Sequence, residues 1–186
     1  MGCLEVWKLL FEPVQYHFQS QQHQCLWKCL DLRNNPGGLL QAGVDIARFW
    51  LTEDTIVYTV NRQGIFGSYD ANNNALTDAP LVVLVNGGSA SASEILAGAL
   101  QDNDRAILIG EKTFGKGLIQ SLFQLQGGSG IAITVAKYET PDHHDINKKG
   151  ITPDIELKQE PISYFEITGD KDIQYQKAVD YLHSQI

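Results

Sequence analysis

The sequence predicts a layered α/β domain, and three observations support this fold class. Two uninterrupted apolar runs, at 81–85 and 106–109, are typical of strands that are buried on both faces of a parallel sheet. Between them, apolar residues recur at the helical spacing i, i+3, i+4, i+7 and i+8: Ala92, Ile95, Leu96, Ala99 and Leu100. Strands that alternate with helices in this way pack in layers around one core.

The other elements are predicted from the same patterns. We expect strands at 26–32, 56–60, 121–125 and 131–138, a helix at 40–51 and a closing helix at 175–186. The polar stretch 64–80, rich in Asn and Gly, is expected to be an exposed loop. Residues 1–25 are rich in Gln and show no sustained period, so we predict an irregular or non-homologous segment with at most one short helix. The domains would then be this segment, a core at 26–160 and a C-terminal segment at 161–186.

Composition excludes several classes of function. The chain of 186 residues is long enough for one domain with a sizeable core, and its net charge of −8 disfavours binding to nucleic acid. No apolar run reaches the roughly 20 residues that cross a bilayer, and residues 1–22 show no signal peptide. Three cysteines without a C-x-x-C pair predict neither a zinc site nor a disulfide framework: Cys3, Cys25 and Cys29.

The segment 87–94, Gly-Gly-Ser-Ala-Ser-Ala-Ser-Glu, joins a predicted strand to a predicted helix. A nucleophile in such a turn is exposed, and the free N–H groups at the helix start can stabilise an oxyanion. The same residues, Ser91-x-x-Glu94, also form a capping box, which requires no catalysis. The local pattern alone leaves both interpretations open.

The segment 110–117 nearly matches the phosphate-binding loop G-x-x-x-x-G-K-[ST]. Gly117 replaces the hydroxyl residue that should hold Mg²⁺, and a strand-like sequence follows instead of a helix. We therefore do not expect a nucleotide, and the simplest interpretation is a solvated Lys116 in a glycine turn. His143 and His144 lie beside Asp145, but adjacent residues of an extended chain point to opposite faces, so a metal site is not expected.

Four blocks together resemble the C-terminal processing peptidases, which are tail-specific serine proteases. The blocks are Asp-Leu-Arg-Asn-Asn-Pro-Gly-Gly at 31–38, Gly-Ser-Ala-Ser-Ala-Ser-Glu-Ile at 88–95, Thr-Phe-Gly-Lys-Gly at 113–117 and Gly-Ile-Thr-Pro-Asp at 150–154. They follow one another in the family's order and cover about residues 31–157. The sequence at 134–141 and 144–147 is most similar to that of the photosynthetic branch, whose cyanobacterial and plastid members trim a photosystem II reaction-centre protein.

This resemblance implies a crotonase/ClpP-like α/β fold and a role for each matching residue. Ser91 matches the nucleophile and Lys116 the general base, while Gln120 matches the residue that hydrogen-bonds the lysine amine. Glu94 matches an acidic residue near the site and is expected to belong to the catalytic group, without a defined role. The N–H groups of Ala92 and Gly37 would form the oxyanion hole. The resemblance implies no metal and no other cofactor.

A serine hydroxyl needs a base to become a good nucleophile, and lysine is a base only when it is neutral. The reference pKa of lysine, about 10.4, must therefore fall towards neutrality. We expect burial of Lys116 between glycines, near Phe114 and away from carboxylates, to lower the pKa.

Family members normally carry a helical N-terminal region and a PDZ module before the core, whereas this chain begins 30 residues before Asp31. The predicted strand leading into Asp31 also places Lys28 where an apolar residue is expected.

The sequence predicts an endopeptidase that acts on polypeptide C-terminal tails through an acyl-enzyme. The alternative is a truncated, inactive core that at most binds peptides at a sheet edge. An acyl-CoA enzyme of the same fold class is a third candidate. The family implies the periplasm or the thylakoid lumen, although no export signal is found.

Overall fold

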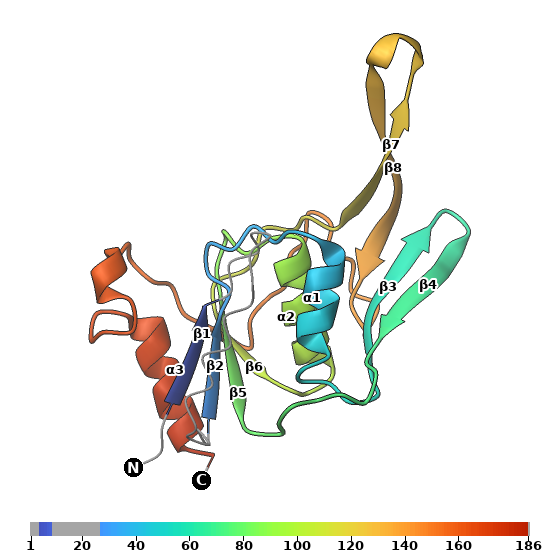
Figure 1. Cartoon of the computed structure of the whole chain (residues 1–186). Helices are drawn as coiled ribbons and strands as arrows, with labels where there is room; N and C mark the ends of the chain where they lie inside the picture. The colour runs from blue at the N-terminus through green and yellow to red at the C-terminus, as the bar shows by residue number, and fades with distance from the viewer. Residues whose placement is uncertain (1–3, 9–26, 186) are drawn as a thin grey trace.

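The computed structural model describes residues 4–8 and 27–185, and it confirms a layered α/β fold (Figure 1). A five-stranded parallel sheet has the order β1-β2-β5-β6-β9. Its strands are β1 (Leu4–Lys8), β2 (Trp27–Asp31), β5 (Leu81–Val85), β6 (Ile107–Gly110) and β9 (Ile155–Glu156). Helices α1 (Leu40–Ala47) and α2 (Ala92–Asp102) cover one face, and α3 (Ile173–His183) covers the other.

A second, antiparallel sheet lies on the far side of α1 and α2 (Figure 1). Its order is β4-β3-β8-β7, and its strands are β3 (Thr55–Asn61), β4 (Gly64–Asp70), β7 (Leu118–Gln124) and β8 (Gly130–Glu139). The hairpin of β7 and β8 projects well beyond the body of the molecule, and the short helix η1 (Gln126–Gly128) closes its tip.

The strand β5 shows why this sequence forms layers. All five of its residues are buried, and alternate side chains enter two different apolar clusters. Val83 packs with α1 and α2, whereas Val82 and Leu84 pack with Ala178 and Leu182 of α3. Because both faces of β5 are covered, the strand appears in the sequence as an uninterrupted apolar run.

The predicted loop at 64–80 was partly wrong, because its first seven residues form the strand β4. This strand pairs with β3 through a turn at 61–64, in which Gly64 has a φ of 111°. Most of β4 faces solvent, and only Tyr69 packs partly against the core. An edge strand that buries so little apolar surface carries no strong period in the sequence.

The N-terminal segment also differs from the prediction. Residues 4–8 form a strand parallel to β2, where we expected irregular structure, and 9–25 lie outside the described residues. Lys28 is partly exposed rather than buried, because it lies next to the amino end of β2. None of the helices in the described ranges is both long and apolar enough to cross a bilayer.

Candidate active site

Loops from distant parts of the chain meet at the carboxyl ends of β2, β5 and β6, the edge where α/β sheets commonly bind ligands. The N–H of Asn34 donates to Oδ1 of Asn86 (2.8 Å), and Nδ2 of Asn86 donates back to Oδ1 of Asn34 (3.1 Å). The N–H of Ala90 donates to the Asn35 carbonyl (3.0 Å), and the N–H of Phe114 donates to the Ser89 carbonyl (3.0 Å). Three of the four sequence blocks are thus joined by direct hydrogen bonds.

Ser91 occupies the sharp turn between β5 and α2, where it is the N-cap of the helix. Its φ of 58° and ψ of −119° lie in a region that residues with a side chain rarely adopt. Such strain persists only where the surroundings enforce it, and it is concentrated at functional sites. The predicted capping box is also present. The capping and nucleophile interpretations are therefore compatible, since the Glu94 carboxylate binds the main chain of Ser91.

Glu94 is fully buried, and its carboxylate joins the turn that carries Ser91 to the loop that carries Lys116, residues 113–117, here called the lysine loop. Oε2 accepts hydrogen bonds from the N–H of Ser91 (2.9 Å) and the N–H of Lys116 (2.8 Å). Oε1 accepts from the hydroxyl of Thr113 (2.6 Å) and the N–H of Gly115 (2.6 Å). Four donors satisfy the buried carboxylate, as a buried charge requires. Glu94 therefore holds the backbones of Ser91 and Lys116 next to one another.

Thr113 is a site residue to which the sequence assigned no role. Its buried hydroxyl donates to Glu94 and accepts from the N–H of Ile151 (2.7 Å). The adjacent Gly150 has a φ of 66°, and a Cβ there would lie 2.3 Å from the Thr113 carbonyl oxygen. The block at 150–154 therefore supports the lysine loop from behind. The sequence offered one indication of this role, a threonine three residues before Lys116. Sequence alone does not show which atoms that threonine contacts.

The turn that carries Gly37 packs closely against the start of α2. Gly37 has a φ of 80°, and a Cβ there would lie 2.4 Å from the Ala90 oxygen and 2.7 Å from the Ala92 nitrogen. The structure thus brings together the two residues expected to form the oxyanion hole. It directs the Gly37 N–H to Oδ1 of Asn35 (3.0 Å), so this donor must turn away from Asn35 before it can bind an oxyanion.

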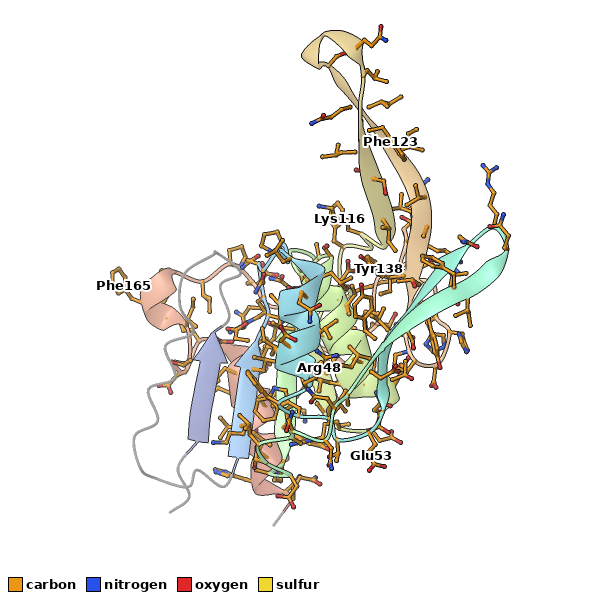
Figure 2. All side chains as sticks on the ribbon, turned by 45° about the vertical axis from the view of Figure 1, so that its right-hand side comes forward. Arg48, Glu53, Lys116, Phe123, Tyr138 and Phe165 are labelled. Atoms are coloured by element: carbon orange, nitrogen blue, oxygen red, sulfur yellow. The ribbon has the colours of Figure 1, made fainter. Side chains whose placement is uncertain are left out.

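Lys116 lies at the foot of the β7–β8 hairpin, above the helices (Figure 2). Its side chain is exposed, so the expected burial near Phe114, itself 67% exposed, is wrong in this structure. Along 113–118 buried and exposed residues alternate, with Thr113, Gly115 and Gly117 facing inwards. The glycines pack against 146–150, and this packing turns the side chain of Lys116 outwards. Gln120 is likewise exposed, on β7 opposite Thr134.

We expect Glu94→Gln to destabilise the site as well as the fold. An amide nitrogen cannot accept, so two of the four donors lose their partner, at a cost of about 3 kcal/mol. The melting temperature should fall by about 6–12 °C. Scanning calorimetry of this variant beside Glu53→Gln, an exposed carboxylate at the far end of the molecule, measures the difference (Figure 2). Equal melting temperatures would show that the four hydrogen bonds make no net contribution to the stability of the fold.

Other candidate chemistries receive no support from the geometry. Burial, and next the charge of Asp31, raises the pKa of Cys29 to about 12, so this thiol stays protonated. His143 stacks on Tyr58 with ring centroids 4.6 Å apart, whereas Nδ1 of His144 lies 3.8 Å from Oδ2 of Asp102. The two histidines therefore have different partners. Within the described ranges, no three His, Cys, Asp or Glu side chains are grouped as metal ligands.

Comparison with known proteins shows the family of the chain. Residues 17–157 match Peptidase family S41, and the match begins inside the segment predicted to be non-homologous. The chain is 72% identical to a carboxyl-terminal-processing protease of Picosynechococcus sp. over 153 residues, which cover 82% of this chain and 37% of the relative. It is 59% identical over 129 residues to carboxyl-terminal-processing peptidase 3, chloroplastic, of Arabidopsis thaliana, covering 68% of this chain and 25% of that one.

Among solved structures, the photosystem II D1 C-terminal processing protease superposes with a TM-score of 0.74 and 47% sequence identity. The similarity covers 83% of this chain and 40% of that chain. Mature CPAF shares the fold alone, with a TM-score of 0.56 and 17% identity. The chain spans less than half the length of each of the two curated relatives described above.

Proposed function

Because the chain belongs to peptidase family S41, we propose that it is a serine-type endopeptidase that cleaves polypeptides near their C-terminus. The observation that carries this proposal is the Glu94 carboxylate, which ties the main chain of a strained Ser91 to that of Lys116. A cap alone would need only the bond to Ser91. The additional bonds to the lysine loop serve a site in which the two residues act together.

In the proposed reaction, Lys116 takes the hydroxyl proton of Ser91 as Oγ attacks the scissile carbonyl. The N–H groups of Ala92 and Gly37 stabilise the oxyanion of the tetrahedral intermediate. Lys116 returns the proton to the leaving amine, and an ester to Ser91 remains. Lys116 then takes a proton from water as the water oxygen attacks the ester, and gives that proton to Oγ of Ser91 as the acyl group leaves. Gln120, on the strand that follows Lys116, would orient the lysine amine.

The exposure of Lys116 indicates what the substrate must contribute. A lysine amine accepts the serine proton only in its neutral form, and removing water from around an amine favours that form. A polypeptide lying over the foot of the hairpin would cover Lys116 and complete the site. The polypeptide would also give the Gly37 N–H an alternative acceptor to Asn35.

The same exposure favours a second candidate, a core that binds peptides without cleaving them. In the described part of the chain, β7 is an outer strand of its sheet and can accept an added strand. Its side chains include the exposed Leu122 and Phe123, the latter visible on the hairpin in Figure 2. Strand addition here would hold a peptide beside Lys116 without requiring a neutral amine.

One experiment separates the two candidates. The purified chain is incubated with a peptide that bears an extended, Ala-rich C-terminal tail, and the products are followed by mass spectrometry. Cleavage, with an acyl adduct on Ser91 after an acid quench, supports the endopeptidase. Retention of the intact peptide by a folded chain supports the binding module. If the peptide is neither cleaved nor retained, the result contradicts both candidates.

We propose that the partners are polypeptide tails, and that the compartment is the periplasm or thylakoid lumen because the relatives are cyanobacterial and chloroplastic.

A further inference from the structure

The described residues that follow the family match, 158–185, pack on the side of the parallel sheet opposite the helices α1 and α2 (Figure 1). Ala178 and Leu182 of α3 are fully buried against the sheet. This packing explains how the segment is attached, but it lies away from the edge where the candidate site is built. A buried cluster of polar contacts connects the segment to that edge.

The connection is an ion-pair cluster around Arg33, whose side chain is only 9% exposed. On one side, Nε and Nη2 donate to the carboxylate of Asp31 (2.9 and 2.8 Å). On the other side, Nη1 and Nη2 donate to the two oxygens of Asp172 (2.7 and 2.8 Å). Nη1 also reaches Oε1 of Gln174 (3.2 Å). A guanidinium held by two planar carboxylates has one defined position.

Asp172 is itself fixed by its surroundings. It is fully buried, and it caps α3 by accepting from the N–H of Tyr175 (3.0 Å). Its Oδ2 also accepts from the N–H of Thr168, which lies before the helix (3.1 Å). Burial alone would raise the pKa of Asp172, but the hydrogen bond from Arg33 and the two N–H donors lower it. The carboxylate is therefore ionised near neutral pH, and Arg33 binds a rigid anion.

Arg33 directly precedes the turn that carries Gly37. Asn34 has a φ of 57° and is held by Asn86, while Asn35 accepts from the N–H of Ala90. The turn is thus fixed at the serine side by these contacts and at its start by the guanidinium. Resting on the proposed function, we propose that the Arg33–Asp172 pair is a positioning device, through which the C-terminal segment holds the Gly37 turn against the start of α2, so that the Gly37 N–H needs only to leave Asn35 to bind an oxyanion.

The test compares the wild type with Asp172→Asn and with a control variant. Asparagine is an equally good N-cap, so α3 keeps its cap while Arg33 loses the carboxylate. Glu166→Gln is the control, because it breaks an exposed ion pair, with Lys171, in the same segment. We expect Asp172→Asn to lower kcat about 10- to 100-fold with KM changed less than about twofold. The affinity for a peptide aldehyde, whose adduct places an oxyanion in the same hole, should fall in parallel with kcat.

Hydrogen exchange supplies a readout that needs no activity. Amides at 34–38 should exchange faster in Asp172→Asn, whereas those at 81–85 should keep the wild-type rate. Unchanged exchange at 34–38 overturns the proposal, and so does faster exchange with an unaltered kcat and aldehyde affinity. A wild-type chain that cleaves nothing contradicts the proposed function instead. Exchange at 34–38 then still decides whether Asp172 holds the turn.

Discussion

We expect Ser91→Ala to abolish peptide cleavage, with kcat reduced at least about 10⁴-fold, as when a serine nucleophile is removed from other peptidases. No other group in the site replaces the hydroxyl, because the acyl-enzyme is an ester of that oxygen. The fold should be nearly unaffected, since alanine keeps the main-chain N–H that Glu94 accepts. Loss of a cap side chain costs about 1 kcal/mol, which lowers the melting temperature by roughly 2–4 °C.

Ser93→Ala is the matched control for this variant. Ser93 lies two residues further along and is fully buried, and no described group hydrogen-bonds its hydroxyl. Removing an unsatisfied buried hydroxyl is neutral or stabilising, so this variant should cleave at the wild-type rate. Mass spectrometry of the cleavage products over time measures both. Residual cleavage by Ser91→Ala at the rate of Ser93→Ala would exclude Ser91 as the nucleophile.

We expect Gly37→Ala to cause the second large loss, through shape rather than chemistry. The new Cβ would lie 2.4 Å from the Ala90 oxygen and 2.7 Å from the Ala92 nitrogen, both of which are main chain and cannot rotate away. The turn must therefore move, and with it the proposed oxyanion donor. A displacement of about 1 Å in such a site can cost about 100-fold in rate, so kcat should fall by at least that factor.

The control for Gly37→Ala is Gly127→Ala, at the tip of the hairpin. Its φ of 84° nearly equals the 80° of Gly37, but a Cβ there meets nothing within 4 Å. Both variants have the same backbone penalty for a side chain at positive φ, about 1–2 kcal/mol, and only one has the collision. Steady-state kinetics and thermal unfolding of the pair separate the two effects. Equal rates in both variants would show that the contact with α2 does not position the site.

Sequence patterns were sufficient where an element is buried. The strand β5 and the helix α2 were predicted, because burial on one or both faces imposes an apolar pattern that needs no partner to be recognised. The β7–β8 pair was predicted although most of it is exposed, because its apolar strand-like runs flank a glycine-rich turn. The strand β4 was missed, since an outer strand with exposed side chains lacks such a pattern.

For the site, sequence could suggest the residues but not their contacts. The resemblance nominated Ser91, Glu94 and Lys116, and the structure joins all three through one carboxylate. The expected burial of Lys116 failed because flanking glycines do not bury a lysine; which way its side chain turns depends on the packing of Gly115 and Gly117 against 146–150. Thr113 was not assigned a role for a related reason: its partners lie 19 and 38 residues away.

The Arg33–Asp172 contact spans 139 residues of sequence, most of the chain. During synthesis, the segment that holds the Gly37 turn therefore emerges from the ribosome long after Ser91 and Lys116. Contacts of such separation form late, because the loop-closure entropy must be overcome first. A nascent chain therefore contains Ser91 and Lys116 before it contains Asp172. In the proposed positioning role, the Gly37 turn reaches its final position only after the C-terminal segment has folded onto the sheet.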